Sequence, residues 1–397
     1  MAKPERNLHI GVVAGEQSGQ LLAADILHQL SKVQDADIRV TGVGGGSLSE
    51  FGIDSFFDPE DIALMGITQV VGRLPTLLQR LKVTVERFAA DLPDVLLLVD
   101  SPDFSSRVAS RLKKRHPDLP IAKYVAPTVW AWRPERAAKM VGTIDHVFAL
   151  FPFEPEIMAE LGGPATTYVG HRLMDDHDLM GIWDKRYKRH SPVGKRLNLL
   201  FLPGSRASEI RALLPDMRLT AEELYRRGVS FRAIIPAVER YAKTIRDAVF
   251  EWHRDIDVSV VVGRDAQLEA FESADAAMAA SGTVTLELAL AGVPAISIYR
   301  MDMLMKPFAS MLTGWSAALP NIIADRVVIP EYYDRQIIPG LMARQLEEIA
   351  DHSTDKYRAI MNGYDVVRKS MKLSRPASES VVEVLLQMLA GQNEKAR

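Results

Sequence analysis

Short, continuous runs of apolar residues alternate with longer amphipathic stretches along the chain. We interpret the apolar runs as buried strands, at residues 10–13, 95–99, 121–125, 146–150, 197–202, 231–235, 258–262, 276–279 and 295–299. Amphipathic patterns such as residues 21–31 and 105–114 lie between them and predict helices. Strands that are apolar throughout and alternate with helices are typical of parallel sheets covered on both faces, so we predict an α/β fold.

The length of the chain favours more than one domain, because 397 residues exceed the size at which single cores stop growing. Residues 175–195 are polar and show neither helical nor strand periodicity, so we interpret them as a linker with a solvated basic surface rather than an anion site. We therefore predict two Rossmann-like lobes with a cleft between them: residues 1–190, which C-terminal helices could complete, and residues 191–375. Residues 376–397 would form a C-terminal helix and tail.

Composition and charge exclude several classes of function. The formal net charge of −3 argues against a protein that binds nucleic acid over much of its surface, because such binding needs a basic face. The absence of cysteine excludes disulfides, thiolate nucleophiles and cysteine-ligated metals. No apolar run approaches the ~20 residues of a membrane span, and the N-terminus does not resemble a signal peptide. We expect a cytoplasmic protein.

Candidate chemistry in the first lobe follows the predicted strands, where ligands of parallel sheets bind. Gly15, Glu16, Ser18 and Gly19 follow the first strand, and such a turn can bind an anion at a helix N-terminus or be purely structural. The glycine-rich residues 42–46 are unspecific. Asp100 ends the run 95–99 and could act as a general base.

Other polar groups of the first lobe have structural alternatives. Asp103 or Ser101 could cap the following helix, and we favour capping for Asp103. Arg133 follows two tryptophans and could bind phosphate, although the tryptophans could simply pack between the lobes. His171 lies in a predicted loop, where a lone histidine is more often structural.

Two motifs in the second lobe suit a nucleotide diphosphate. Gly204, Ser205 and Arg206 follow a strand and offer amides, a hydroxyl and a cation, but Arg206 could instead pair with Glu209 on the helix surface. The second motif follows the run 276–279 and comprises Ser281, Gly282, Thr283, Thr285 and Glu287. Its hydroxyls could cap a helix and present amides to phosphate, and the Glu287 carboxylate could accept two ribose hydroxyls. Asn321 and Glu331 follow in a stretch that we interpret as a loop.

We expect neither a metal nor another cofactor. The paired acids Asp35/Asp37 and Asp255/Asp257 precede strands instead of following them. The nine histidines include no pair spaced for a helical zinc site.

A membrane-facing surface is a further candidate. Residues 62–82 combine many aliphatic side chains with Arg73, Arg80 and Lys82, which is typical of a lipid-binding flap, but a core-facing helix from Leu74 onward explains the pattern equally well. Methionines and aromatic residues between 303 and 315 could form a matching patch on the second lobe.

Taken in order, these motifs resemble the lipid-A-disaccharide synthase family. The resemblance extends from Gly15-Glu16 to Glu331 and includes Gly44-Gly45, Met65-Gly66, Asp100-x-Pro102-Asp103-Phe104, Pro127-x-Val129-Trp130-Ala131-Trp132-Arg133, Pro152-Phe153-Glu154, Val169-Gly170-His171, Leu202-Pro203-Gly204-Ser205-Arg206, Ser281-Gly282-Thr283-x-Thr285-Leu286-Glu287 and Leu319-Pro320-Asn321. Each motif is short, but the ordered set is specific. Gln20 departs from the family, which usually has an acid there, and Val125-Ala126 replaces a more polar stretch.

The resemblance implies a GT-B glycosyltransferase of lipopolysaccharide synthesis. Such an enzyme transfers 2,3-diacylglucosamine from UDP-2,3-diacylglucosamine to 2,3-diacylglucosamine 1-phosphate (lipid X), with inversion and without metal. The products are the β-1,6-linked lipid A disaccharide 1-phosphate and UDP. Members act peripherally at the cytoplasmic surface of the inner membrane of Gram-negative bacteria, and many are homodimers. The alternatives are another GT-B sugar-nucleotide enzyme and a binding homologue that has lost catalysis.

For an inverting transfer, Asp100 is our first candidate for the base, followed by Glu16 and His171. We expect the substrate contacts to come from Ser18, Gly19, Arg133, Gly204, Ser205, Arg206, Ser281, Gly282, Thr283, Thr285, Glu287 and Asn321.

Overall fold

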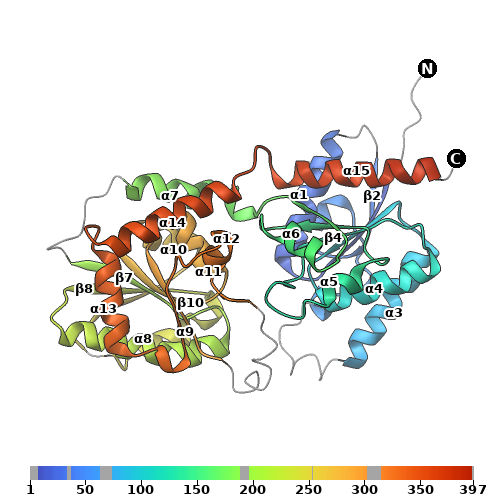
Figure 1. The fold of residues 1–397 in the computed structure, drawn as a ribbon. Helices are drawn as coiled ribbons and strands as arrows, with labels where there is room; N and C mark the ends of the chain where they lie inside the picture. Colours follow the sequence, from blue (N-terminus) through green and yellow to red (C-terminus); the bar gives the residue numbers. More distant parts are fainter. Residues whose placement is uncertain are drawn as a thin grey trace. The chain divides into compact units, whose positions relative to one another are not determined.

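The computed structural model describes residues 8–33, 37–62, 74–187, 196–252, 254–301 and 314–395. The chain forms two compact units (Figure 1). The first combines Met1–His171 with Leu373–Arg397, and the second is Arg172–Lys372.

The first unit contains a parallel six-stranded sheet in the order β2-β1-β3-β4-β5-β6. Its strands are β1 (Leu8–Ala14), β2 (Ile38–Val43), β3 (Val95–Val99), β4 (Ile121–Tyr124), β5 (His146–Ala149) and β6 (Ala165–Tyr168). Every residue of β3 is buried, because this central strand is covered on both faces.

Helices cover both faces of this sheet. They are α1 (Gln17–Val33), α3 (Leu74–Ala90), α4 (Pro102–Arg115), α5 (Arg136–Met140), α6 (Glu154–Glu160) and α15 (Ala377–Lys395). On one face, Val381, Val382 and Leu385 of α15 join side chains of α1 in the core. On the other, α3 and α4 contribute Leu81, Val85 and Val108. The last helix of the chain therefore completes the first unit, as the ribbon shows (Figure 1).

The second unit has its own parallel six-stranded sheet, in the order β12-β11-β10-β7-β8-β9. Its strands are β7 (Leu197–Leu202), β8 (Phe231–Ala237), β9 (Asp257–Val262), β10 (Ala276–Ala280), β11 (Ala295–Tyr299) and β12 (Glu331–Tyr333). Its helices are α7 (His177–Tyr187), α8 (Ala207–Arg226), α9 (Glu239–Val249), α10 (Arg264–Ser273), α11 (Thr283–Ala291), α12 (Leu319–Ile323), α13 (Pro339–Ala350) and α14 (Asp355–Met371).

The α/β fold and all nine predicted strands are confirmed. Three edge strands, β2, β6 and β12, are not among the nine apolar runs, because each is incompletely buried and carries polar residues. The stretch around Asn321 and Glu331, which we interpreted as a loop, contains the short helix α12 and begins β12.

The interpretation of residues 175–195 as a linker is wrong for its first half. Residues 177–187 form α7, and Leu179 and Ile182 on it are buried. The Arg186 side chain is 7 % exposed and donates hydrogen bonds to the carbonyl oxygens of Gly292 (2.9 Å) and Phe271 (3.0 Å). These carbonyl acceptors offset the free-energy cost of burying a cation and attach α7 to the second unit. That unit begins at Arg172.

Candidate active site

Each sheet has one position where the chain order reverses, and ligands of doubly wound sheets bind beyond the strand ends at such a position. In the first unit it lies between β1 and β3, and in the second between β7 and β10. The loop with Glu16 and Ser18 follows β1, and Asp100 follows β3. Gly204–Arg206 follow β7, and Ser281 follows β10. These predicted site residues therefore collect at the two reversal points, one in each unit, whereas Arg133, His171 and Asn321 lie elsewhere.

The two loops of the first unit are packed together. A methyl group at Gly19 would lie 3.2 Å from a Val99 side-chain carbon, so glycine allows α1 to approach β3 closely. At Gly15 a methyl group would lie 3.3 Å from the Ser101 hydroxyl. Gln20, where the family usually has an acid, is buried and donates its amide hydrogen to the carbonyl oxygen of Gly15 (3.2 Å). Gln20 thus supports the loop that carries Glu16 and Ser18.

Asp100 occupies an unusual backbone conformation. Asp100 and Ser101 have φ values of 54° and 42°, in the left-handed region that non-glycine residues rarely adopt. The Asp100 carbonyl oxygen accepts hydrogen bonds from the Ser105 hydroxyl (2.8 Å) and the Lys123 ammonium (3.0 Å). Among the described residues, the Asp100 carboxylate accepts no hydrogen bond, so its oxygens are available to a ligand. Strained backbone of this kind is concentrated at functional sites.

The predicted capping by Asp103 is not observed. Asp103 lies in the first turn of α4 and forms an ion pair with Arg136 at 2.9 Å. Ser101 is the N-cap residue, but its side chain makes no capping hydrogen bond.

Lys123 is a site residue that the sequence analysis missed. Its side chain is 1 % exposed, and burial lowers the pKa of the ammonium to about 8, although the charges of Asp100 and Asp103 act in the opposite direction. In the sequence, Lys123 is the one charged residue within the apolar run 121–125, and this could have identified it as a candidate.

Glu154, the acid of the Pro152-Phe153-Glu154 motif, organises the neighbouring strand end. Its buried carboxylate accepts hydrogen bonds from the amides of Leu150 (2.9 Å) and Phe151 (3.0 Å) and from the indole of Trp130 (3.3 Å). Desolvation nevertheless raises its pKa to about 7. Glu154 thereby fixes the loop that leads from Trp130 to Arg133.

Arg133 and His171 differ in their exposure. Arg133 is exposed, has a φ of 54° and holds its guanidinium 5.3 Å from the ring centre of Trp132, so the cation remains available to an anionic ligand. His171 stacks on Phe151, with ring centres 5.4 Å apart, and desolvation lowers its pKa to about 4. Its imidazole is therefore neutral at pH 7.

In the second unit, the loop after β7 already holds a carboxylate. Gly204 has a φ of 104°, and Glu209 accepts hydrogen bonds from the amides of Ser205 (3.1 Å) and Arg206 (3.3 Å). The Arg206 guanidinium donates to the same carboxylate at 2.7 Å, so the surface pair that we considered as the alternative is present. These donors surround an anion, as a diphosphate site requires, and Glu209 occupies them here.

The loop after β10 leads into α11, but the predicted capping by a hydroxyl is not observed, because Gly282 is the N-cap residue and no side chain caps the helix. Gly282 has a φ of 146°, Thr283 is exposed, and Thr285 is buried with its hydroxyl bonded to the Gly282 carbonyl oxygen (2.7 Å). The Ser281 hydroxyl donates to the carbonyl oxygen of Ala317 (3.0 Å). Thr283 is thus the hydroxyl of this motif that faces solvent.

Glu287 belongs to a charged network that the sequence analysis did not find. Its carboxylate accepts hydrogen bonds from Arg264 (3.2 Å) and Gln267 (3.3 Å), and Arg264 also pairs with Asp176. Desolvation raises the pKa of Glu287, while Arg264 acts against the shift. The network fixes the carboxylate on the first turns of α11.

Asn321 supports a loop from inside. It is fully buried, and its side-chain oxygen accepts from the amides of Val328 and Ile329, both at 2.7 Å. Its amide nitrogen donates to Glu331 (3.0 Å), which also binds the amides of Ala317 and Ala318. With these bonds made, Asn321 positions residues 316–321 and offers no surface to a substrate.

The proposed lipid-facing segment lies partly outside the described residues, which omit 63–73 and 302–313. Within α3, Leu81 is 1 % exposed and Leu77 packs against the core, so these two leucines are not lipid-facing. Leu78 is exposed, as is Trp315 in the second unit. Arg80 forms an ion pair with Asp61 at 2.8 Å. A core-facing helix therefore accounts for α3.

Among the described residues, no helix is long and apolar enough to cross a membrane. Nor do the described acids and histidines form a group of three that could hold a metal ion.

Comparison with known proteins identifies the family. A sequence model described as lipid-A-disaccharide synthetase matches residues 10–385. The lipid-A-disaccharide synthase of Rhodospirillum centenum is 36 % identical over 383 residues, which are 95 % of each chain. That of Nitrobacter winogradskyi is 37 % identical over 390 residues, 98 % of this chain and 97 % of its own.

Solved structures share the fold at low sequence identity. MurG of Acinetobacter baumannii has a TM-score of 0.55 at 14 % identity, with 96 % of this chain and 99 % of that chain covered. The UDP-GlcNAc 2-epimerase of Neisseria meningitidis, bound to UDP-GlcNAc, has a TM-score of 0.59 at 14 % identity, with 96 % and 100 % covered. The two α/β units thus form a GT-B fold. The chain belongs to the lipid-A-disaccharide synthase family of glycosyltransferases.

Proposed function

We propose that this protein transfers 2,3-diacylglucosamine from UDP-2,3-diacylglucosamine to the 6-hydroxyl of 2,3-diacylglucosamine 1-phosphate. The products are the β-1,6-linked disaccharide 1-phosphate and UDP. Family membership over nearly the whole chain supports the reaction. The observation that carries the proposal at the site is the convergence of an anion-binding loop and a fixed carboxylate at adjacent strands β7 and β10.

In this proposal the second unit binds UDP. Arg206 and the amides of Ser205 and Arg206 bind the diphosphate after Glu209 releases them, and Thr283 adds a hydroxyl at the start of α11. Glu287 accepts the ribose hydroxyls. These cations and amides stabilise the departing diphosphate, so the reaction needs no divalent metal.

The first unit supplies the base. Asp100 takes the proton of the acceptor hydroxyl while that oxygen attacks the anomeric carbon from the side opposite the diphosphate, so the configuration inverts. Ser18, the start of α1 and Arg133 bind the acceptor, and Arg133 meets its phosphate. Glu16 is the second candidate for the base. We also propose that the protein reaches its lipid substrates at the inner-membrane surface through exposed positions of the segment 62–82, such as Leu74 and Leu78, and that it forms a homodimer.

Calorimetric titration with UDP tests the nucleotide assignment. Arg206→Ala removes a charge-assisted contact and should weaken UDP binding by roughly tenfold or more. Glu287→Ala should weaken it through the ribose. Arg226→Ala is a matched control, because Arg226 also pairs with a glutamate on α8 but lies at the other end of the helix. If both site variants bound UDP as tightly as wild type, the assignment would be wrong.

A further inference from the structure

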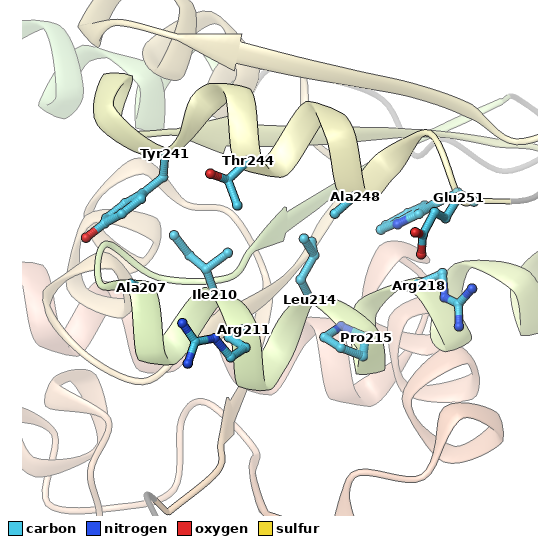
Figure 2. Close-up of a pocket in the computed structure, with 11 residues that line it drawn as sticks. Ala207, Ile210, Arg211, Leu214, Pro215, Arg218, Tyr241, Thr244, Ala248 and Glu251 are labelled. Atoms are coloured by element: carbon cyan, nitrogen blue, oxygen red, sulfur yellow. The ribbon is translucent and has the colours of Figure 1, made fainter.

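A groove separates helices α8 and α9 in the second unit (Figure 2). Its volume of about 450 Å³ lies within the range of small-molecule sites. Ile210, Leu214 and Trp252 line it and are each at most 6 % exposed. Figure 2 shows Ile210 and Leu214 of α8 facing Thr244 and Ala248 of α9 across it. The interior is therefore apolar, and a cavity of this kind favours hydrocarbon over water.

One end of the groove adjoins the loop that we assign to the diphosphate. Ala207 lines this end and directly follows Arg206. Tyr241 lies opposite, and its neighbour Arg240 donates a hydrogen bond to the Ser205 carbonyl oxygen (3.0 Å). The Arg240 guanidinium also lies 4.8 Å from the ring centre of Tyr241. Both walls are thus connected to the loop.

The groove then continues away from the loop along α8. Its lining on this helix extends from Ala207 to Arg218, which a rise of ~1.5 Å per residue makes roughly 16 Å long. That length and the apolar middle of the groove, which ends at the charged Arg218 and Glu251, suit one extended fatty-acyl chain better than a planar ring or a peptide helix.

Of the two arginines that line the groove, one is free to bind the head of such a chain. Arg211 lies one turn from Ala207, and among the described residues it makes no hydrogen bond or ion pair. Its guanidinium can donate to the carbonyl oxygen of the ester or amide with which an acyl chain begins. The ester or amide would then be recognised near the loop, and the hydrocarbon chain would be buried farther along the groove.

We propose that this groove binds one acyl chain of the UDP-sugar donor, with Arg211 bonded to the acyl carbonyl. The assignment rests on the proposed function, because only a donor with its diphosphate at Ser205 and Arg206 would place an acyl chain at Ala207. It adds a hydrocarbon subsite to the nucleotide site and explains how the second unit would distinguish an acylated UDP-sugar from UDP-GlcNAc.

A variant that fills the groove tests the proposal. Ala248→Phe inserts a ring between the helices from a half-exposed position, so the fold should persist. With acceptor absent, calorimetry should show that the variant binds UDP-2,3-diacylglucosamine about tenfold more weakly than wild type and binds UDP unchanged. Lys243→Phe is the control, because it adds the same ring on the solvent side of α9, where the lysine side chain is 88 % exposed.

Equal binding of the acylated donor by wild type and Ala248→Phe would overturn the groove assignment while leaving the nucleotide site intact. Failure of wild type to bind UDP would instead contradict the proposed function. A second measurement separates the two cases. The fatty acid ω-bromododecanoate should quench Trp252 fluorescence in wild type but not in Ala248→Phe, with Trp252→Phe giving the background of the other tryptophans. Equal quenching in wild type and Ala248→Phe would exclude an acyl chain from the groove.

Discussion

Asp100 lies in a strained turn whose backbone is fixed by hydrogen bonds from other side chains. Ser105 and Lys123 both donate to its carbonyl oxygen, which leaves the carboxylate oxygens clear. A left-handed residue costs of order 1–3 kcal/mol and persists only where its surroundings impose it. At the scale of the residue, therefore, the hydrogen bonds of the turn use the backbone of Asp100 and leave its carboxylate available.

Asp100→Asn should abolish most of the activity without unfolding the protein. Asparagine keeps the shape but cannot take the proton, and loss of a general base typically slows turnover by ~10²–10⁴. UDP affinity and the unfolding transition should remain those of wild type. Asp103→Asn is the control, since that carboxylate is engaged with Arg136. Near-normal turnover by Asp100→Asn would transfer the role to another group, with Glu16 as the next candidate.

Lys123 predicts a distinctive dependence of stability on pH. Its pKa is about 8 in the folded protein, against an ordinary 10.5, so between these values unfolding takes up a proton. The free energy of unfolding should therefore rise with pH across this window, by roughly 3 kcal/mol if the whole shift is realised. Urea titrations of wild type and Lys123→Met at pH 7.5 and 10.5 check this. A difference between the two proteins that did not change with pH would show that the ammonium is not desolvated.

At the scale of the element, α3 has a core face and an exposed face, and the two need to be distinguished before any membrane role is assigned. Leu81 packs with Val85 and Phe88 inside the first unit, whereas Leu78 is 44 % exposed. The aliphatic run in the sequence is thus mainly the ordinary consequence of an amphipathic helix.

Two substitutions on α3 should affect different properties of the protein. Leu81→Ser should lower the free energy of unfolding by about 2–5 kcal/mol, because it leaves a cavity and buries a hydroxyl. Leu78→Ser should leave stability nearly unchanged and weaken sedimentation with anionic vesicles at low salt. Equal stability of the two variants would contradict the packing, and unaltered vesicle binding by Leu78→Ser would remove α3 from the membrane surface.

Elements whose signal is local could be predicted from the sequence. The nine apolar runs became strands, and the loops after β1, β3, β7 and β10 carry the polar groups that their positions indicated. The groups that support the loops at the strand ends could not be predicted. Lys123, Glu154 and Arg264 act on residues that lie more than twenty positions away or on another element. Helix α7 was missed for the same reason, because Arg186 is stabilised by carbonyl groups about a hundred residues later.

At the scale of the whole molecule, the two units divide the proposed reaction. The second offers anion-binding donors and a fixed carboxylate, and the first offers the free carboxylate of Asp100. Neither unit contains both sets, so the proposal predicts that transfer requires both units. The C-terminal helix α15, which returns to the first unit, therefore belongs to the smallest fragment that we expect to be active.

The most direct test is to incubate the purified protein with UDP-2,3-diacylglucosamine and 2,3-diacylglucosamine 1-phosphate and to measure both products by mass spectrometry. We expect UDP and the acylated disaccharide 1-phosphate in equal amounts, at the same rate in excess EDTA as with magnesium, and almost none with Asp100→Asn. Activity that appeared only with magnesium would contradict the metal-independent mechanism. If neither condition gave disaccharide while the protein bound UDP, the central claim that this chain is an active transferase would be wrong.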